Sequence, residues 1–356
     1  MPVNPSHLGV LQIEPTDVCN LACAMCAPHA EAWEHVHGVP KGTLDVDLHA
    51  RIVRTLADEG CRFDHVIYQW LGDPSVHPQL ERLLADAGRA LAGRVGYLRV
   101  DTNGVLLGPS RLERLLATRA PDVPLLVVLS LDATSPETYR RVKGRDAYAL
   151  ATRHARHLLA LRARHAPGVH LQFQFVVQRA NAHEAGAFLR YWSDAVRCHG
   201  HGHGHAEILF KRLSVGGGAE GQAAADVLYE HTLASHGITP IEGEHLSVRT
   251  WEQRPWLLDD GDGVADRAPA HVCPGPWMTP VIRHDGMLQA CCSDLGGTHA
   301  LGSLREHAFL DLWNGERARA LRRTLLAGAR PGACAGCGGI AWYTLPEDAG
   351  ERVPTG

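Results

Sequence analysis

The stretch CNLACAMC, residues 19–26, places three cysteines within eight residues, and we call it the three-cysteine loop. It comes shortly after the apolar segment 9–13, which has the composition of a buried strand. Cysteines spaced four and then three residues apart can converge on one thiophilic metal centre if the loop wraps around it. Structural zinc takes four ligands, and His29 is the only further local candidate. Three thiolates on a [4Fe-4S] cluster would instead leave one iron open to a small molecule.

The composition of the chain is that of an ordinary globular protein. Of its 356 residues, 45% are apolar and 21% are charged, and the net charge of -4 gives no sign of a nucleic-acid partner. The N-terminus lacks a signal-peptide pattern and no run approaches 18 apolar residues, which predicts a cytoplasmic protein with no membrane contact. In that reducing compartment the ten cysteines are poor candidates for disulfides. Eight of them cluster toward the two ends of the chain, which favours metal binding.

Short apolar runs alternate with helical patterns over residues 1–213, which predicts βα units and a parallel sheet. Asp45 is a helix N-cap candidate ahead of an apolar stripe that ends at Gly60, and Ser110 with Glu113 has the spacing of a capping box. The run 169–177 alternates in polarity, so its polar face is expected to line a barrel lumen. The six predicted strands are residues 9–15, 64–72, 97–103, 124–132, 169–177 and 205–213.

The rest of the chain divides into a linking segment and a second domain. Residues 214–272 contain three consecutive glycines and a Gly- and Asp-rich run, which predicts a bridging segment with one helix. Residues 273–356 form the predicted second domain, in which an Asp285-Gly286 turn joins two short strands. A helix from about Ser303 to Leu326 is expected to lead into the CAGC stretch at 334–337. The histidine-glycine tract at 199–205 has no fixed geometry and receives no catalytic role.

The three-cysteine loop and the ends of three later strands together resemble the radical S-adenosylmethionine (SAM) enzymes. The pattern C-x3-C-x2-C follows the first strand, and the stretch 71–74, Leu-Gly-Asp-Pro, follows the second. The tripeptide 102–104, Thr-Asn-Gly, follows the third strand, and the tripeptide 130–132, Ser-Leu-Asp, follows the fourth. Their order at four successive strand ends is typical of a site on the C-terminal edge of a barrel. The expected fold is α/β, a partial (β/α)6 radical SAM barrel followed by a small α+β iron-sulfur domain.

The resemblance implies the chemistry of the first domain. Cys19, Cys23 and Cys26 would hold a [4Fe-4S] cluster whose open iron binds SAM, and one electron would cleave SAM to a 5′-deoxyadenosyl radical. That radical would abstract a hydrogen atom, while the protein orients the substrate and excludes water. A flavodoxin or a ferredoxin is the expected reductant. The SAM-binding residues implied by the motifs are Gly72, Asp73, Pro74, Asn103, Ser130 and Asp132.

The cysteines of the second domain resemble those of the SPASM and Twitch extensions of radical SAM enzymes. Cys273, Cys291, Cys334 and Cys337 suffice for one auxiliary [4Fe-4S] cluster, and the shorter Twitch type is favoured because a two-cluster SPASM domain needs more cysteines. Taken alone, these four thiols would also suit zinc. Cys292 has three open roles: a spare thiol, an alternative ligand or a hydrogen-atom donor. Since neighbouring residues on a strand face opposite ways, Cys291 is the expected ligand.

The leading functional hypothesis is oxidation of a secondary alcohol of a sugar or cyclitol to a ketone. The four auxiliary cysteines are similar to those of Twitch dehydrogenases in aminoglycoside antibiotic biosynthesis, where the auxiliary cluster would accept one electron. Glu207 or Lys211 would take the hydroxyl proton. The expected substrate contacts are Tyr68, Trp70, Gln172 and Gln174. The alternatives are an epimerase with Cys292 as hydrogen donor, a decarboxylase, a ribosomal-peptide maturase, and a non-catalytic iron-sulfur or zinc scaffold.

Overall fold

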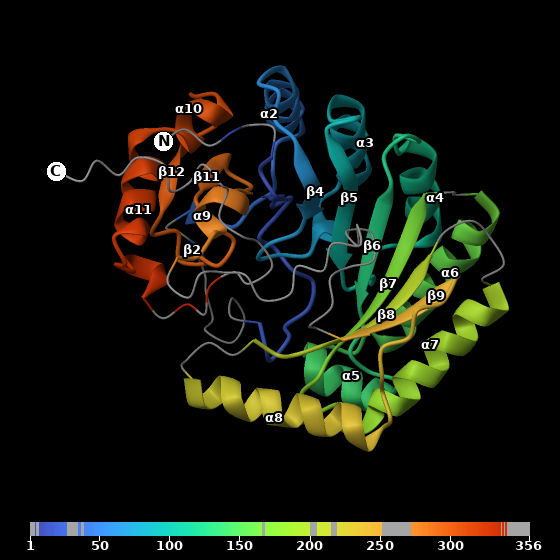
Figure 1. The fold of residues 1–356 in the computed structure, drawn as a ribbon. Helices are drawn as coiled ribbons and strands as arrows, with labels where there is room; N and C mark the ends of the chain where they lie inside the picture. The colour runs from blue at the N-terminus through green and yellow to red at the C-terminus, as the bar shows by residue number, and fades with distance from the viewer. Residues whose placement is uncertain are drawn as a thin grey trace.

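One sheet of ten strands runs through both halves of the chain. In the computed structural model the strand order is β12-β11-β10-β1-β4-β5-β6-β7-β8-β9 (Figure 1). The structure describes residues 4, 7–26, 35–36, 39–165, 168–199, 205–214, 219–250, 272–335, 337 and 339. His29, the centre of the histidine-glycine tract and residues 251–271 of the predicted bridging segment lie outside the described residues.

Seven of the ten strands, all parallel, form the partial barrel. The six predicted strands are confirmed, although most of them end a few residues earlier than expected. A seventh, β9 (Leu246–Thr250), pairs with β8 and comes from the segment predicted to bridge the two domains. The first six strands of the barrel are β1 (Val10–Ile13), β4 (Phe63–Tyr68), β5 (Val95–Thr102), β6 (Leu125–Ser130), β7 (Val169–Val176) and β8 (Ala206–Lys211). A separate two-stranded hairpin pairs β2 (His35–Val36) with β3 (Val39–Pro40).

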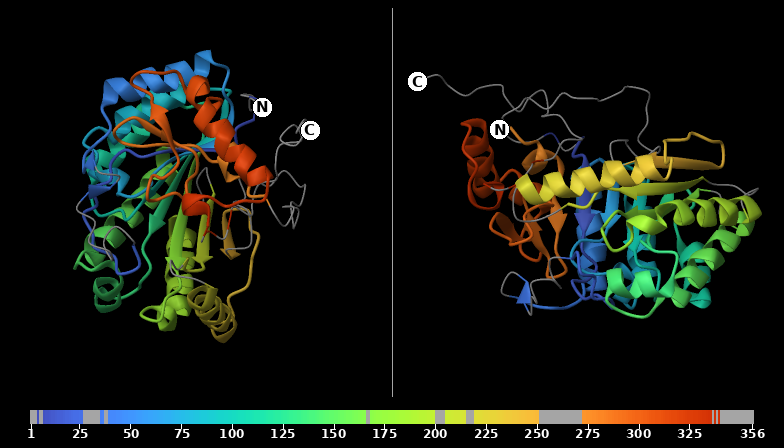
Figure 2. Two further views of the ribbon diagram at one scale, coloured as in Figure 1. Left: turned by 90° about the vertical axis from the view of Figure 1, so that its left-hand side faces the viewer. Right: turned by 90° about the horizontal axis from the view of Figure 1, so that it is seen from below.

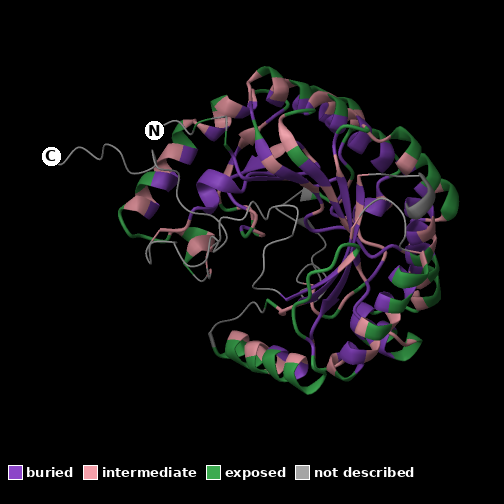
Figure 3. Ribbon diagram, turned by 45° about the vertical axis from the view of Figure 1, so that its right-hand side comes forward, coloured by how far each residue is buried: buried purple, intermediate pink, exposed green. Residues whose placement is uncertain are grey.

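Helices cover the outer, convex face of the sheet (Figures 1 and 2). The strands are mostly buried, whereas the outward faces of the helices are exposed (Figure 3). None of the described helices is long and apolar enough to cross a membrane. The α-helices are α2 (Val46–Asp58), α3 (Leu80–Ala90), α4 (Pro109–Thr118), α5 (Pro136–Lys143), α6 (Tyr148–His165), α7 (Ala185–His199), α8 (Ala219–Ser235), α9 (Gly275–Met278), α10 (Phe309–Trp313) and α11 (Glu316–Leu326). Short 3-10 helices are η1 (Pro74–Val76), η2 (Ala182–Glu184) and η4 (Gly332–Cys334).

The alternation of β7 sorts its side chains between the core and the lumen. On the helix side, Phe173 stacks on Trp192 of α7 with ring centroids 4.2 Å apart. On the other side, Gln174 donates to the Ser130 hydroxyl of β6 at 3.1 Å. Gln172, on the same side as Gln174, bonds to a carboxylate of β8. The polar face therefore lines the lumen, as the sequence predicts.

The start of α2 agrees with the sequence, whereas two other predicted helix boundaries are wrong. The Asp45 carboxylate caps α2 by accepting from two backbone N–H groups of its first turn. The predicted capping box at Ser110 does not form, because α4 begins at Pro109, a residue favoured in the first helical turn. The predicted helix 303–326 is two helices preceded by β12, and Gly315 separates α10 from α11. A Cβ atom on Gly315 would lie 2.7 Å from the Asp311 carbonyl oxygen, so the tight break requires glycine.

The second domain joins the barrel through the free edge of β1. β10 (Val281–Ile282) pairs with β1 in parallel, and β11 (Met287–Gln289) and β12 (Ala300–Ser303) extend the sheet in antiparallel fashion. The predicted Asp285-Gly286 turn between β10 and β11 is confirmed, with a φ of 88° at Gly286. Beside this turn, His284 donates its backbone N–H to a Glu14 carboxylate oxygen at 3.2 Å, and its ring Nδ1 lies 3.1 Å from the same oxygen. A buried polar contact thus reinforces the strand pairing.

We predict that the His284–Glu14 contact makes stability pH-dependent. Burial alone would lower the pKa of His284, but the hydrogen bond and charge of Glu14, with Asp17 adding to them, raise that pKa above its ordinary value. The contribution is therefore fully present below about pH 6.5 and is lost as the pH rises through the raised folded-state pKa. His284→Gln should lower the free energy of unfolding by about 1–3 kcal/mol near pH 6 and by less at pH 9. Urea denaturation at both pH values measures this difference.

The exposed His231 provides the matched control. His231→Gln should change the free energy of unfolding by less than about 0.5 kcal/mol at either pH. An equal loss at pH 6 and pH 9 for His284→Gln would show that the charge of the imidazole plays no part.

Candidate functional site

The three-cysteine loop lies at the C-terminal edge of the barrel and is anchored on two sides. The backbone N–H of Ala22 donates to the Lys143 carbonyl at the end of α5, at 3.1 Å. On the other side, Asn103 after β5 donates from its side-chain amide to the Asn20 side-chain oxygen at 2.9 Å. The position of the loop is therefore set by elements that lie far from it in the sequence.

The loop after β4 packs directly against the backbone that leads into the three-cysteine loop. A Cβ atom on Gly72 would lie 2.4 Å from the Thr16 carbonyl oxygen and 2.6 Å from that of Val18, so only glycine fits. The next residue, Asp73, donates its N–H to the Val18 carbonyl at 3.1 Å. Its buried carboxylate accepts from the Asn103 N–H at 2.7 Å. Asp73 thus fastens together the loops that follow β1, β4 and β5.

The end of β6 carries a strained residue held by a buried ion pair. Asp132 has a φ of 58°, and among the described residues it is the only one other than glycine with a positive φ. Its carboxylate pairs with Lys143 and accepts from the Val176 N–H at 2.6 Å, and Asn181 donates to its carbonyl at 2.9 Å. Lys143 Nζ also lies 3.5 Å from Ser130 Oγ. These contacts hold an unfavourable backbone conformation and position the Ser130 hydroxyl.

The residues predicted to bind SAM therefore gather at three neighbouring strand ends beside the three-cysteine loop. They are Gly72, Asp73 and Pro74 after β4, Asn103 after β5, and Ser130 and Asp132 at the end of β6. Sequence reasoning missed Lys143, because it lies on α5, outside the tripeptide motifs. It also missed Asn20 and Asn181, which carry no motif signal.

The thiols of the three-cysteine loop lie in a partly buried, mutually repelling group. Burial raises the pKa of Cys19 to about 12, and the charges of Asp73, Cys23 and Cys26 add to this rise. Burial also raises the pKa of Cys23, although the Lys143 ammonium opposes the change. Without a bound cation Cys19 and Cys23 would keep their protons, so metal binding must release them.

The four predicted auxiliary thiols come from both ends of the second domain and lie near one another. Burial raises the pKa of Cys334 to about 11, and the neighbouring thiols of Cys291, Cys273 and Cys337 contribute to the rise. A Cβ atom on Gly339 would lie 3.8 Å from Cys273 Sγ, which places the chain just after the CAGC stretch beside Cys273. Four cysteines that are 18, 43 and 3 residues apart in the sequence thus form one group of thiols in the fold.

Backbone amides are already directed at the sulfur atoms of both groups. At four cysteines the N–H two residues further on lies within hydrogen-bonding distance of Sγ: Cys19 (3.5 Å), Cys273 (3.4 Å), Cys291 (3.5 Å) and Cys337 (3.3 Å). Such bonds stabilise thiolate charge and tune iron-sulfur clusters. Within the described residues, no three His, Cys, Asp or Glu side chains lie close enough to hold a single metal ion. The thiol donors and their N–H partners fit iron-sulfur clusters.

Cys292 does not lie where the sequence argument placed it. That argument assumed a regular strand, but β11 ends at Gln289, and Cys291 and Cys292 lie in the turn beyond it. Their thiols lie close enough to share a hydrogen bond, which raises the pKa of Cys291 and lowers that of Cys292. The Cys292 carbonyl accepts from Trp70 Nε1 at 3.0 Å. Cys292 thus lies where the auxiliary thiols meet the β4 loop of the barrel.

The two candidate bases lie at opposite ends of β8, and both face the lumen. Glu207 is the second residue of the strand and is buried, with Arg249 of β9 3.4 Å away and a hydrogen bond from Gln172. Burial raises the pKa of Glu207. Lys211 is the last residue of the strand, at the C-terminal edge of the barrel. Burial lowers the pKa of Lys211, and Arg99 across the lumen lowers it further.

Several polar atoms in the lumen lack partners in the part of the chain that the structure describes. They are Oε1 of Gln172, Oε1 of Gln174 and the hydroxyl of Tyr97. In contrast, Arg99 and Asp101 form a two-pronged ion pair at 2.6 and 2.7 Å. A buried polar atom without a partner costs about 1–3 kcal/mol, so at these atoms a polar ligand would gain a hydrogen bond that the described residues do not supply.

Two residues predicted to contact the substrate, Tyr68 and Trp70, pack against other parts of the protein. Tyr68 lies on the helix side of the sheet, where its hydroxyl is 2.8 Å from Nε2 of His49 in α2, so its prediction as a lumen residue is wrong. The strand alternation of β4 turns it outward. Trp70 packs with Leu71 and Val281 at the junction with the second domain.

A thiol-rich loop on the C-terminal edge of a partial barrel, followed by a second thiol-rich domain, defines an iron-sulfur barrel protein. The sequence model of the radical SAM superfamily matches residues 13–164, and that of the iron-sulfur cluster-binding SPASM domain matches residues 273–338. The chain is therefore a radical SAM enzyme with a C-terminal SPASM domain, and its cofactors are SAM and [4Fe-4S] clusters.

Two curated relatives illustrate the spread of the family. GTP 3′,8-cyclase of Synechococcus sp. (strain CC9902) is 31% identical over 137 residues, which are 38% of this chain and 36% of that protein. The chain thus matches about a third of the cyclase. The tungsten-containing aldehyde ferredoxin oxidoreductase cofactor-modifying protein of Pyrococcus furiosus is 24% identical over 326 residues, which are 86% of this chain and 81% of that protein.

Solved structures share the fold at low sequence identity. The structure of anSMEcpe with bound AdoMet has a TM-score of 0.57 at 16% identity and covers 88% of this chain and 82% of its own. Streptococcus suis SuiB bound to the precursor peptide SuiA has a TM-score of 0.56 at 13% identity and covers 89% of this chain and 67% of its own. These likenesses show the fold alone.

We predict that Gly72→Ala disrupts the site. The new methyl group would meet two backbone carbonyls of the segment leading to Cys19 and push that segment away. A displacement of about 1 Å in such a site costs about 100-fold in rate, so formation of 5′-deoxyadenosine from SAM should fall by about that factor. Reconstituted protein reduced with dithionite provides the assay.

Gly296 is the matched control, because a Cβ atom there would have no neighbour within 4 Å. Gly296→Ala should leave the rate of 5′-deoxyadenosine formation unchanged. If Gly72→Ala were as active as the wild type, the packing of the β4 loop against the three-cysteine loop would not matter for the site.

Proposed function

We propose that this radical SAM enzyme oxidises a secondary alcohol of a small polar molecule, such as a sugar or cyclitol, to a ketone. The observation that carries the proposal is the position of Lys211 together with its lowered pKa. Lys211 is a lysine at the catalytic edge of the lumen whose pKa is lowered by burial. A neutral amine in that position can accept the hydroxyl proton that such an oxidation must remove.

We assign the two clusters to the two groups of thiols. Cys19, Cys23 and Cys26 would hold the SAM-binding cluster, and the auxiliary cluster would be held by Cys273, Cys291, Cys334 and Cys337. When bound, SAM and its cluster supply a hydrogen-abstracting radical and the auxiliary cluster supplies an acceptor for one electron, which leaves one proton for the protein to remove. The hydrogen bonds from backbone N–H groups to Sγ support this assignment.

Lys211 suits the role of base better than Glu207. Glu207 already faces Arg249 and accepts a hydrogen bond from Gln172. It also lies four residues below Lys211 on β8, about 13 Å further from the edge of the barrel at ~3.3 Å per residue. Only Lys211 therefore lies at the height of the residues assigned to SAM.

The unpartnered polar atoms of the lumen support a hydroxyl-rich substrate. The side-chain oxygen of Gln174, one layer above Glu207, can accept a hydrogen bond from a substrate hydroxyl group, whereas Gln172 and Tyr97 lie at or below the level of Glu207. The Arg99–Asp101 ion pair lies on another wall of the lumen, on β5, and makes that wall polar. A purely apolar ligand would leave these polar groups without hydrogen bonds, at a cost of about 1–3 kcal/mol for each group.

We predict that Lys211→Arg separates hydrogen abstraction from oxidation. The guanidinium keeps the positive charge but holds its proton, so ketone formation should fall by about 100-fold or more while 5′-deoxyadenosine still forms. In the wild type, ketone formation should rise with pH as Lys211 loses its proton, at a pH below the ordinary lysine range, because the pKa is lowered. Mass spectrometry of a panel of cyclitols and sugars detects products two mass units lighter.

Lys41→Arg, the same exchange at a half-buried lysine, is the control and should leave ketone formation unchanged. A product of unchanged mass that carries solvent deuterium would indicate an epimerase, and a loss of 44 mass units a decarboxylase. A modified peptide would indicate a maturase. Each of these results would overturn the proposed oxidation, and full activity of Lys211→Arg would overturn the role of that residue.

A further inference from the structure

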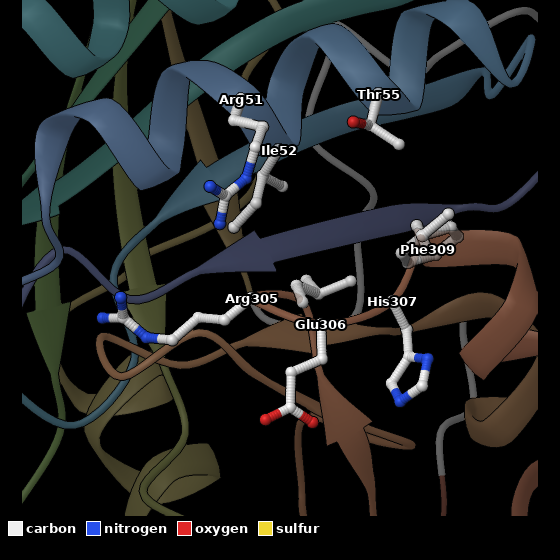
Figure 4. A pocket seen from close by; sticks show the side chains of 9 residues that line it. Arg51, Ile52, Thr55, Arg305, Glu306, His307 and Phe309 are labelled. Atoms are coloured by element: carbon white, nitrogen blue, oxygen red, sulfur yellow. The ribbon is translucent and has the colours of Figure 1, made fainter.

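We propose that Gln289, the last residue of β11 in the second domain, binds a hydroxyl group of the substrate with its side-chain amide. The inference rests on the proposed oxidation of a polar alcohol and deepens it, because it adds a contact from the SPASM domain to those of the barrel. The site lies on the lumen side of the sheet, away from the surface pocket between α2 and the turn before α10, which Arg51 and Arg305 help to line (Figure 4).

The register of the sheet places Gln289 on the lumen side. Residues paired directly across neighbouring strands point to the same face. Gln289 pairs with Val281 of β10, Val281 pairs with Gln12 of β1, and Gln12 pairs with Ile67 of β4. Ile67 faces the lumen because the next residue, Tyr68, points to the helix side. Gln289 therefore points into the lumen from a position two strands away from Gln12, a distance of about 10 Å.

This part of the row lies at the C-terminal edge of the barrel. Gln12 is one residue before the end of β1, Ile67 is one residue before the end of β4, and Val281 is one residue before the end of β10. The side chain of Gln289 thus lies at the height of the strand ends. Lys211, the proposed base, is at the same edge on β8.

The amide of Gln289 is buried, and neither of its polar atoms has a partner. The residue is 0% exposed, and within the described part of the chain both Oε1 and Nε2 lack a hydrogen bond. On the same face of the sheet, Gln12, Gln172 and Gln174 each donate from Nε2 to an oxygen of the protein. Among these four glutamines, only Gln289 leaves both amide atoms open.

The two open atoms select the chemistry of the group that would complete them. Oε1 needs a donor and Nε2 needs an acceptor, and a hydroxyl group can act as both. The sulfur atoms of an iron-sulfur cluster could accept from Nε2 but could not donate to Oε1. A substrate hydroxyl therefore satisfies Gln289 better than the auxiliary cluster alone does.

Gln289 also lies where the lumen meets the auxiliary thiols. Val281, its neighbour on β10, packs with Trp70 and against Cys292. The expected cluster ligand Cys291 is only two residues beyond Gln289 in the sequence. A hydroxyl bound by Gln289 would lie close to the electron acceptor that the proposed oxidation needs.

The strand pairing is irregular at this residue. Leu288 pairs with Gly302 of β12, but Gln289 pairs with Ala300, so Leu301 is left without a partner in the ladder. Such a β-bulge bends the strand and changes the direction of side chains, and bulges are frequent beside active sites. The bulge is a second local feature that supports a binding role for Gln289.

The first test measures stability, because a buried amide without partners lowers the stability of the protein that carries it. Gln289→Leu replaces this amide with an apolar group of similar size. We expect the variant to raise the melting temperature of the reconstituted holoenzyme by about 1–3 °C. Gln12→Leu is the matched control from the same row, and it should lower the melting temperature, because Gln12 donates to the Gln69 carbonyl at 2.6 Å.

A lowered or unchanged melting temperature for Gln289→Leu would show that the amide has a structural partner, such as a buried water molecule. That result would overturn the proposal. The measurement needs no turnover, so it does not depend on the proposed oxidation.

The second test measures KM for a cyclitol or sugar that the wild type converts. We expect Gln289→Leu to raise this KM by about tenfold or more, because a hydrogen bond to the substrate is lost. The rate of 5′-deoxyadenosine formation without substrate and the reduction potential of the auxiliary cluster, titrated by electron paramagnetic resonance, should both stay at the wild-type values. If the product is that of an epimerase or a decarboxylase, the oxidation fails, while KM for that substrate still tests Gln289.

Two results of this second test would contradict the proposed contact. An unchanged KM would show that Gln289 does not bind the substrate. A shifted potential of the auxiliary cluster with an unchanged KM would show that the amide donates to the cluster instead.

Discussion

The structure depends on the hydrogen bonding of β1 along both of its edges. On one edge β1 pairs in parallel with β4, and on the other it pairs in parallel with β10 of the second domain. The same strand leads into the three-cysteine loop. One short strand therefore fixes the position of the three-cysteine loop relative to the thiols of the second domain. A hinged pair of domains would let that separation vary, whereas a shared sheet holds it constant.

The site is reinforced by buried polar contacts that would be costly without the fold around them. The Asp132–Lys143 pair and the Asp73 carboxylate each tie two or more strand ends together. Removing one partner of such a buried pair leaves an uncompensated charge, which costs about 3–5 kcal/mol. These contacts therefore specify one arrangement of the loops. The amide oxygens of Gln172 and Gln174 in the lumen are the counterpart, because no described residue completes their hydrogen bonds.

The sequence predicts the parts of this molecule that depend on local pattern. Short apolar runs between helical patterns identified the six strands, Asp45 identified the start of α2, and the Asp-Gly pair identified the β10–β11 turn. Contacts that form only in the folded chain could not be predicted from the sequence. Lys143 comes from a helix with no motif, and β9 lies in a segment whose composition indicates a linker. Tyr68 was misplaced because one residue of register decides between helix side and lumen. The assumption of a regular strand at Cys291 and Cys292 was wrong, because β11 ends at Gln289.

The central claim is that three thiolates hold a cluster with one open iron while four others hold a second, fully ligated cluster. Iron and sulfide analysis of the reconstituted protein, combined with electron paramagnetic resonance before and after addition of SAM, tests it most directly. The account predicts about eight iron atoms per chain, about four in the variant that lacks Cys19, Cys23 and Cys26, and a signal that SAM changes only when those three cysteines are present. Four iron atoms in the wild type, or a signal that SAM does not alter, would contradict it.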